Sequence, residues 1–269
     1  MNSKEKLDKV KKDIKNFGKV AVAFSGGVDS TFLSKICFDV LGKDAIAVTI
    51  ISPMMPKSEI EDAIQFTKSI GIEHVLISDD SIEEEVLNNS VDRCYFCKKI
   101  EFNKIVKAAE GKGIQYVLDG SNADDEFDYR PGLKALNELK IISPLRIARL
   151  AKKEIRELSK RLNLETWNKP ALACLASRIP YGEKITIDKL STIDRAESYL
   201  KKLGLIQFRV RSHGDIARIE IAPEERDKLF DTALMDKISK ELKLYGFTYV
   251  CMELEGYKTG SMNVKISKG

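Results

Sequence analysis

The chain lacks a long hydrophobic run: none of its 269 residues falls in an apolar stretch approaching the roughly 18 residues that a membrane-spanning helix needs. Its first residues are charged and amphipathic, unlike a secretory signal peptide. Proline is scarce, at 7 residues, and glycine amounts to 16, so collagen-like and low-complexity chains are excluded. We therefore expect a globular protein without a membrane span.

Neither positive nor negative side chains are in large excess. Lysine and arginine total 45, aspartate and glutamate 41, and the net charge is +4. That balance does not by itself indicate a nucleic-acid partner. Five cysteines, an odd number, do not form a disulfide framework, and they fit a reducing cytoplasm. Only two histidines are present, and we interpret His74 and His213 as ordinary strand or turn residues rather than metal ligands.

Short apolar runs alternate with amphipathic segments in the first part of the chain. This alternation is typical of an α/β fold with a doubly wound parallel sheet. The expected helices cover residues 3–17, 31–41, 56–70, 99–110 and 150–162, and the expected strands cover 19–24, 45–51, 74–77 and 116–118.

The pattern changes after about residue 150, where a loop-like stretch precedes a smaller α+β unit. We expect a helix capped by Thr186, strands over 207–211, 218–222 and 247–254, and a helix that starts between residues 223 and 230. The predicted domains are a nucleotide-binding domain over 1–175 and a substrate-binding and oligomerisation domain over 176–269.

A glycine-containing loop, Ser25-Gly26-Gly27-Val-Asp29-Ser30, stands between a predicted buried strand and a predicted helix. The glycines let the backbone approach an anion, the helix N-terminus offers free N–H groups, and the two serines add hydroxyl donors. No Gly-Lys-Ser/Thr follows and no G-x-G-x-x-G is present, so neither a kinase-type P-loop nor a dinucleotide fingerprint is indicated.

Further polar residues follow predicted strands. Thr49 lies at the end of the second strand, and Asn122 and Asp125 follow the fourth. Open parallel sheets bind ligands at the carboxyl ends of their strands. These residues are therefore candidates for the nucleotide or a metal, although solvated turns explain Asn122 and Asp125 equally well.

The loop resembles the PP-loop of the ATP pyrophosphatase superfamily, whose SGGxDS signature it matches at residues 25–30. The resemblance implies that ATP adenylates a substrate and releases pyrophosphate with Mg²⁺. It also implies that Asp29 helps to hold Mg²⁺ and the phosphates.

Cys94 and Cys97 form a C-x-x-C pair, which by itself fits zinc, a redox pair or an iron–sulfur cluster. No second C-x-x-C exists, so the usual structural zinc pattern is incomplete. Cys37 and Cys251 lie in a predicted helix and a predicted strand, and we interpret both as core residues.

Cys174 lies in an irregular segment between Lys169 and Arg178. Nearby cations favour a reactive thiolate, and the alternative is a small buried apolar residue. A cubane cluster normally takes four thiolates, so a cluster on Cys94, Cys97 and Cys174 would leave one iron open for an extra sulfide. Alternatively, Cys174 gives up its own sulfur or forms a persulfide.

Arg209 and Arg211 stand two apart on a predicted strand and so point to one face. Two guanidinium groups there suit the phosphate of a mononucleotide, while a solvated basic strand face is the alternative. Ser177 and Arg178, beside Cys174, are further candidates for contact with that phosphate.

The whole chain resembles the LarE-type sulfur transferases of nickel-pincer nucleotide cofactor biosynthesis. The discriminating segments are 169–182, 209–215 and 254–263, and further resembling segments are 23–31, 93–98, 119–125, 129–132 and 143–145. The resemblance implies that a pyridinium-3,5-dicarboxylate mononucleotide is adenylated, that a sulfur nucleophile displaces AMP, and that two such rounds give the dithio product.

The resemblance also implies site residues and partners. The catalytic residues would be Cys174, Asp29, Ser177 and Arg178, with Glu197 and Glu220 near the substrate phosphate and a metal. Three cysteines match the subset thought to hold a [4Fe-4S] cluster, whereas another subset sacrifices the cysteine at the position of Cys174. A homo-oligomer, an upstream carboxylase and a downstream nickel-inserting enzyme are implied as partners.

Three other functions are weighed against this one. A tRNA thiolation enzyme predicts a basic face and an RNA-binding appendage, neither of which is visible. An amide-forming enzyme of the NAD or GMP synthetase type predicts an ammonia source and no need for Cys174. A non-enzymatic iron–sulfur or zinc module leaves the phosphate loop unexplained.

Overall fold

The computed structural model describes residues 1–127, 131–258 and 260–263, so the motif positions Tyr129, Arg130 and Thr259 lie outside the described residues. The chain forms two compact units. The first comprises Met1–Ser52, Ser58–Asp80 and Cys94–Ala171, and the second comprises Pro53–Lys57, Ser81–Arg93 and Leu172–Gly269. Within the described ranges, no helix has both the length and the apolar character required to cross a membrane.

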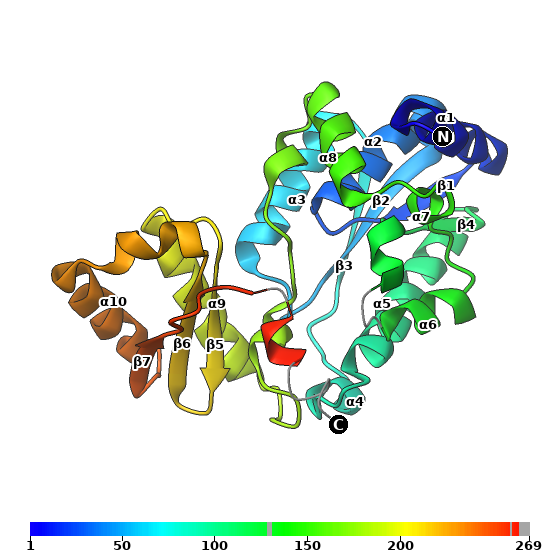
Figure 1. Cartoon of the computed structure of the whole chain (residues 1–269). Coiled ribbons are helices and arrows are strands. Elements are labelled where there is room, and N and C mark those ends of the chain that lie inside the picture. Colours follow the sequence, from blue (N-terminus) through cyan, green and yellow to red (C-terminus); the bar gives the residue numbers. More distant parts are fainter. Residues whose placement is uncertain (128–130, 259, 264–269) are drawn as a thin grey trace. The chain divides into compact units, whose positions relative to one another are not determined.

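The first unit is built on a four-stranded parallel sheet in the order β3-β2-β1-β4 (Figure 1). Its strands are β1 (Val20–Ala23), β2 (Ala45–Ile51), β3 (Glu73–Ser78) and β4 (Tyr116–Leu118). Every neighbouring pair in it is parallel. The expected α/β fold with a parallel sheet is therefore confirmed.

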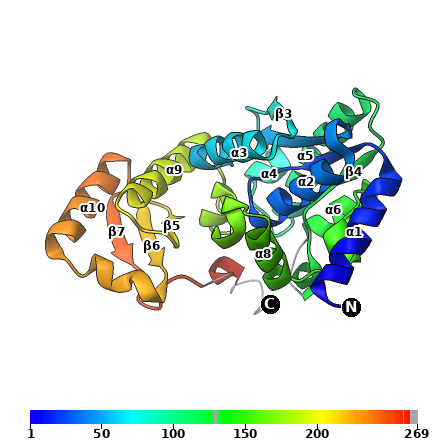
Figure 2. The same cartoon turned by 90° about the horizontal axis from the view of Figure 1, so that it is seen from above.

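Helices cover both faces of this sheet (Figures 1 and 2). Phe102 and Ile105 of one helix pack against Ala21, Ile46 and Val48 of the sheet. That helix, α5 (Arg93–Glu110), shares its face with α6 (Gly132–Glu138). The other face carries α1 (Ser3–Phe17), α2 (Val28–Leu41), α3 (Lys57–Ile70) and α8 (Lys152–Arg161). The shorter helix α7 (Pro144–Ile147) belongs to the same unit, with 3₁₀ turns at Gly42–Asp44, Ala123–Phe127 and Glu165–Asn168.

The boundaries of α1 show how local sequence sets a helix. Val10 and Ile14 are fully buried, as the predicted apolar face requires. Asn2 caps the helix by accepting the backbone N–H of Glu5 at 3.0 Å, and the Glu5 carboxylate accepts the N–H of Asn2 at 3.0 Å. This capping box satisfies donors that the first turn otherwise leaves free.

Helix α5 begins six residues earlier than predicted, at Arg93 rather than residue 99. Its first turn is fastened by side chains: Lys99 Nζ donates to Tyr95 Oη at 2.9 Å, and Tyr95 Oη donates to Glu138 at 2.8 Å. Because this bond reaches a different helix, no local pattern predicts it. The C-x-x-C pair consequently lies inside the first turn of a helix and not in a loop.

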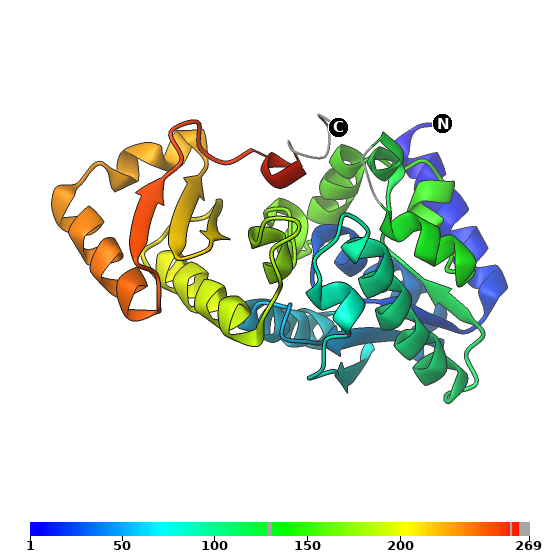
Figure 3. The same ribbon diagram turned by 90° about the horizontal axis from the view of Figure 1, so that it is seen from below.

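The second unit holds a three-stranded mixed sheet in the order β5-β6-β7, seen with its helices in Figure 3. Strands β5 (Phe208–His213) and β6 (Ile216–Ile221) are antiparallel, and β7 (Tyr249–Met252) runs parallel to β6. The helices α9 (Ile187–Lys202) and α10 (Thr232–Leu244) and the short helix α4 (Glu84–Leu87) belong to this unit. The segment Pro223–Leu229 is a 3₁₀ helix and not the predicted start of an α-helix, and further 3₁₀ turns span Leu175–Arg178 and Ser261–Asn263.

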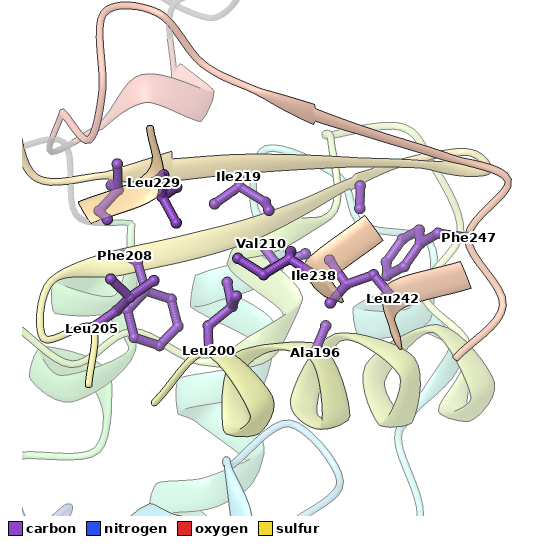
Figure 4. Close-up of a cluster of buried hydrophobic side chains, with 12 residues drawn as sticks. Ala196, Leu200, Leu205, Phe208, Val210, Ile219, Leu229, Ile238, Leu242 and Phe247 are labelled. Carbon is purple, nitrogen blue, oxygen red and sulfur yellow. The ribbon is translucent and has the colours of Figure 1, made fainter. Parts of the chain in front are cut away.

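One hydrophobic cluster fills the second unit (Figure 4). Ala196 and Leu200 of α9 and Ile238 and Leu242 of α10 pack on the same face of the sheet. The alternating residues of β5 place Val210 in this cluster. The opposite face of β5 is therefore left for its arginines.

The two cysteines interpreted as core residues differ. Cys37 is fully buried in α2, and burial raises the pKa of its thiol well above the usual range. Cys251 is exposed, so its interpretation as a core residue is wrong. It lies on the edge strand β7, where Val250 and Met252 pack against the cluster and the residue between them faces outward.

We expect Leu242→Ala to lower the free energy of unfolding by about 2–5 kcal/mol, because it opens a cavity in the cluster. Leu244→Ala is the matched control, since that side chain is 70% exposed on the same helix. Chemical denaturation of both variants measures the difference. Equal effects of the two substitutions would contradict the role of the cluster.

Candidate functional site

The glycine-containing loop joins β1 directly to the N-terminus of α2. Gly26 has a positive φ of 71°, which favours glycine, and Gly27 is the residue that precedes the helix. The hydroxyl oxygens of Ser25 and Ser30 lie 3.2 Å apart, and Ser30 Oγ donates to the Gly27 carbonyl at 3.3 Å. The predicted loop residues therefore surround the N-terminus of α2, where free N–H groups suit an anion.

Asp29 lies in the first turn of α2, and its two carboxylate oxygens differ. Oδ2 accepts Lys152 Nζ at 2.5 Å and Asn122 Nδ2 at 3.4 Å. Oδ1 is buried and has no hydrogen-bond partner among the described residues. A buried oxygen without a partner is costly, and a carboxylate oxygen is a ligand that Mg²⁺ prefers. The residues present therefore fit a magnesium ion beside the loop.

The residues after β4 lie beside the glycine-containing loop. The backbone N–H of Asn122 donates to Asp125 Oδ2 at 2.9 Å, and Asn122 Oδ1 accepts the N–H of Asp124 at 2.9 Å. A Cβ on Gly120 would lie 3.0 Å from the backbone nitrogen of Ser30. The loop after β4 thus approaches the phosphate loop at Gly120, and its contact brings Asn122 to Asp29.

Thr49 is engaged inside the sheet. Its buried hydroxyl donates to the Phe24 carbonyl at 2.7 Å and lies 2.8 Å from His74 Nε2, while His74 Nδ1 lies 2.9 Å from Thr67 Oγ1. Burial lowers the pKa of His74. The imidazole joins two hydroxyls as a structural bridge, and a contact of Thr49 with ATP stays a prediction.

Buried arginines gather in the second unit. Arg178 Nε and Nη2 donate to the two carboxylate oxygens of Glu197 at 3.0 and 2.9 Å. Burial works against the charge of Arg178, but the Glu197 carboxylate outweighs it and raises the pKa of the guanidinium. Glu197 Oε1 also accepts the backbone N–H of Val210 at 2.9 Å, which ties Arg178 to β5.

The two arginines of β5 lie in the same cluster. Arg211 Nη2 donates to Glu220 Oε2 at 2.7 Å, and its Nη1 donates to the Ser177 carbonyl at 3.1 Å. Burial and the neighbouring Arg178 charge lower the pKa of Arg209. The structure thus brings together six predicted site residues: Ser177, Arg178, Glu197, Arg209, Arg211 and Glu220. It adds Arg218, Tyr257 and Ser261, which the sequence reasoning missed.

Cys174 lies at the start of the 3₁₀ helix Leu175–Arg178 with its side chain exposed. Its carbonyl accepts the Ser177 N–H at 3.0 Å, Ser177 Oγ at 2.8 Å and Arg178 Nη1 at 2.9 Å. The alternative of a buried apolar residue is therefore wrong. The backbone holds an accessible thiol in a fixed place beside the arginine cluster.

Known proteins resemble this chain over most of its length. A relative from Lactiplantibacillus plantarum, named pyridinium-3,5-bisthiocarboxylic acid mononucleotide synthase, is 38% identical over 95% of this chain and 92% of its own. This chain belongs to the LarE-type family.

Three more comparisons give further similarities. An uncharacterised protein of Synechocystis sp. is 40% identical over 98% of each chain. A glutamine-hydrolysing GMP synthase of Aeropyrum pernix is 27% identical over 74% of this chain and 42% of its own. A family model described as NAD synthase matches residues 3–108, which include the phosphate loop. The LarE-type chain is therefore an ATP-dependent enzyme of the PP-loop superfamily, and ATP and Mg²⁺ are its implied cofactors.

The C-x-x-C pair of this LarE-type chain offers two half-buried thiols on one helical turn. Cys97 Sγ donates to Glu101 Oε1 at 3.4 Å. Among the described residues, no three histidine, cysteine, aspartate or glutamate side chains gather into a metal site. Two thiols on one turn are of a kind that would suit an iron–sulfur cluster. The third proposed ligand, Cys174, belongs to the second compact unit.

A buried Asn–Arg pair holds the segment that follows Cys174. Asn89 Nδ2 donates to the Pro180 and Glu183 carbonyls at 2.8 and 2.9 Å, and its Oδ1 accepts Arg93 Nη1. Arg93 Nη1 also donates to the Ala176 carbonyl at 3.0 Å. Sequence reasoning missed both residues because the carbonyls that they bind lie more than 80 residues away from them in the sequence.

We expect Gly120→Ala to weaken ATP binding about tenfold, because the new Cβ pushes the loop after β4 away from α2. Isothermal calorimetry with Mg²⁺ and a non-hydrolysable ATP analogue measures the affinity. Gly111→Ala is the control, since a Cβ there meets only ordinary contacts at 3.5 Å. Unchanged affinity in Gly120→Ala would show that the close approach does not matter for the nucleotide.

Proposed function

We propose that this enzyme converts the carboxylates of a pyridinium-3,5-dicarboxylate mononucleotide into thiocarboxylates. The observation that carries the proposal is the exposed thiol of Cys174 on a segment fixed by Arg178, within a cluster of buried arginines. The name of the Lactiplantibacillus plantarum relative supports the substrate. A small nucleotide is a suitable substrate because a few arginines suffice to bind one phosphate.

The first step belongs to the phosphate loop. A substrate carboxylate oxygen attacks the α-phosphorus of ATP, an acyl adenylate forms, and pyrophosphate leaves. Gly26, Gly27 and the serines bind the phosphates, and Asp29 with Asn122 and Asp125 orients them. Mg²⁺ held at Asp29 would neutralise the charge of the leaving pyrophosphate.

The second step belongs to the arginine cluster. The substrate phosphate binds Arg209 and Arg211, and Ser177 and Arg178 lie next to them. The lowered pKa of Arg209 reflects burial and a neighbouring cation, and a phosphate relieves this repulsion. Glu197 and Glu220 now pair with arginines, and a phosphate that takes their place leaves both carboxylates for a metal.

Two sources of sulfur fit the proposal. In one, the Cys174 thiolate attacks the acyl carbonyl, AMP leaves, and elimination across Cα and Cβ releases the thiocarboxylate and leaves dehydroalanine. In the other, Cys94, Cys97 and Cys174 would hold a [4Fe-4S] cluster, which would supply sulfide to the acyl adenylate as AMP leaves. Each source gives one thiocarboxylate per ATP, and the substrate needs two rounds.

The assembly and the pathway are part of the proposal. We expect a homo-oligomer, as the LarE-type resemblance implies. A carboxylase must supply the dicarboxylate substrate, and a nickel-inserting enzyme must consume the dithio product.

An amide-forming reaction is the second candidate, because GMP synthases are among the relatives. It uses the same acyl-activating loop but takes nitrogen from ammonia. Such a reaction does not use the exposed thiol of Cys174. Product formation with ammonia and a Cys174→Ala variant would favour it.

We expect Cys174→Ala to abolish thiocarboxylate formation while Mg²⁺–ATP binding stays at the wild-type level. Cys251→Ala is the matched control, since Cys251 is also exposed. Mass spectrometry of the wild-type protein after turnover separates the sulfur sources. A loss of about 34 Da at Cys174 means that its own sulfur is used, and an unchanged mass means an external source. Sulfur transfer by Cys174→Ala would contradict the proposal.

For the cluster, we expect anaerobic purification to give a brown protein with about four irons per chain. The double variant Cys94→Ser with Cys97→Ser should lose the colour and the iron, and Cys251→Ser should keep both. Iron analysis and absorption spectra measure the outcome. A colourless wild-type protein with full activity would remove the cluster and leave Cys174 as the sulfur source.

A further inference from the structure

Lys169 is a cation beside the phosphate loop to which neither the loop signature nor the proposed steps assign a role. Its Nζ donates to Glu59 Oε2 at 2.6 Å and to Asp62 Oδ2 at 2.8 Å. The same nitrogen lies 3.4 Å from the carbonyl oxygen of Gly26, the second residue of the loop signature. All four residues belong to the first compact unit.

The backbone of Lys169 is held in place. Its N–H donates to the Thr166 carbonyl at 2.9 Å, and its carbonyl accepts Arg156 Nη2 at 2.8 Å. Pro170, whose ring limits the backbone further, follows in the chain. Because the backbone is fixed, the ammonium group can change position only by rotation about the four side-chain bonds of Lys169.

The ammonium pairs with more than one carboxylate. Glu59 and Asp62, on the first two turns of α3, share this one lysine beside a loop suited to phosphates. The side chain is 13% exposed and lies over the Phe66 ring at 5.1 Å, so solvent screens the charges only in part. An arriving triphosphate would be repelled by the carboxylates and attracted by the lysine.

We propose that Lys169 is a further phosphate-contacting residue, which Glu59 and Asp62 hold beside the loop until the nucleotide arrives. An ammonium group has three donors, so Lys169 turns one of them toward a phosphate oxygen while it keeps one carboxylate. Glu59 and Asp62 then compete with ATP for the lysine. The inference rests on the nucleotide site of the proposed function and not on its sulfur step.

The competition predicts that loss of the lysine weakens nucleotide binding, whereas loss of either carboxylate does not. Calorimetry with Mg²⁺ and a non-hydrolysable ATP analogue compares Lys169→Met, Glu59→Gln and Asp62→Asn with the wild type. Lys169→Met should weaken binding about 10- to 100-fold, as expected for a lost charged hydrogen bond. Glu59→Gln and Asp62→Asn should bind the analogue at least as tightly as the wild type.

Lys68→Met is the control, because it makes the same chemical change at an exposed position of α3, the helix that carries Glu59 and Asp62. Thermal melting of each variant confirms that it is folded at the temperature of the binding experiment. Parallel weakening by Lys169→Met and Glu59→Gln would show a purely structural ion pair and overturn the inference. Wild-type affinity in Lys169→Met would overturn it too. Failure of the wild-type protein to bind the analogue would instead count against the nucleotide site of the proposed function.

Discussion

The parallel pairing of β1 with β4 is the constraint on which the nucleotide site depends. Val22 pairs with Leu118, so both strands end at the same edge of the sheet, and the loops that follow them leave side by side. Gly120 then allows the loop after β4 to approach the backbone of Ser30 closely. Asp29 and Asn122, 93 residues apart in the chain, come within 3.4 Å as a consequence. A different strand order would separate the loop from the residues that complete it.

Buried charge is the corresponding constraint in the second unit. The three buried arginines of the cluster, Arg178, Arg209 and Arg211, require compensation, because an isolated buried charge costs several kcal/mol. Glu197 accepts hydrogen bonds from Arg178 with both carboxylate oxygens, and Glu220 Oε2 accepts two from Arg211. Arg178 also donates to the backbone carbonyl of Cys174. The cluster therefore orders the segment that carries the thiol. The same groups that would bind the substrate also determine where Cys174 lies.

Sequence reasoning predicts what local patterns encode. The parallel sheet, the phosphate loop and the two arginines of β5 follow from periodicity and spacing, and the structure has them. It missed the start of α5 because Tyr95 and Lys99 are fixed by Glu138 on another helix. It placed Cys251 in the core because alternation alone does not show which residues of an edge strand face outward.

The lysines of the nucleotide site were missed for a related reason. Lys152 reaches Asp29 across 123 positions, and Lys169 reaches Gly26 across 143. In one sequence, such residues cannot be distinguished from the many solvated lysines of this chain. Their position beside the glycine-containing loop follows only from the fold, which brings distant segments to the carboxyl ends of the strands.

Both units keep cations next to carboxylates: Lys152 pairs with Asp29, Lys169 with Glu59 and Asp62, Arg178 with Glu197 and Arg211 with Glu220. A phosphate that takes the place of such a carboxylate exchanges one ion pair for another, so the cation is never left buried without a partner. The displaced carboxylate is then available to a divalent metal that accompanies the phosphate. On this proposal, the cations stay paired before the nucleotide binds, and the affinity for phosphates would depend on a divalent metal.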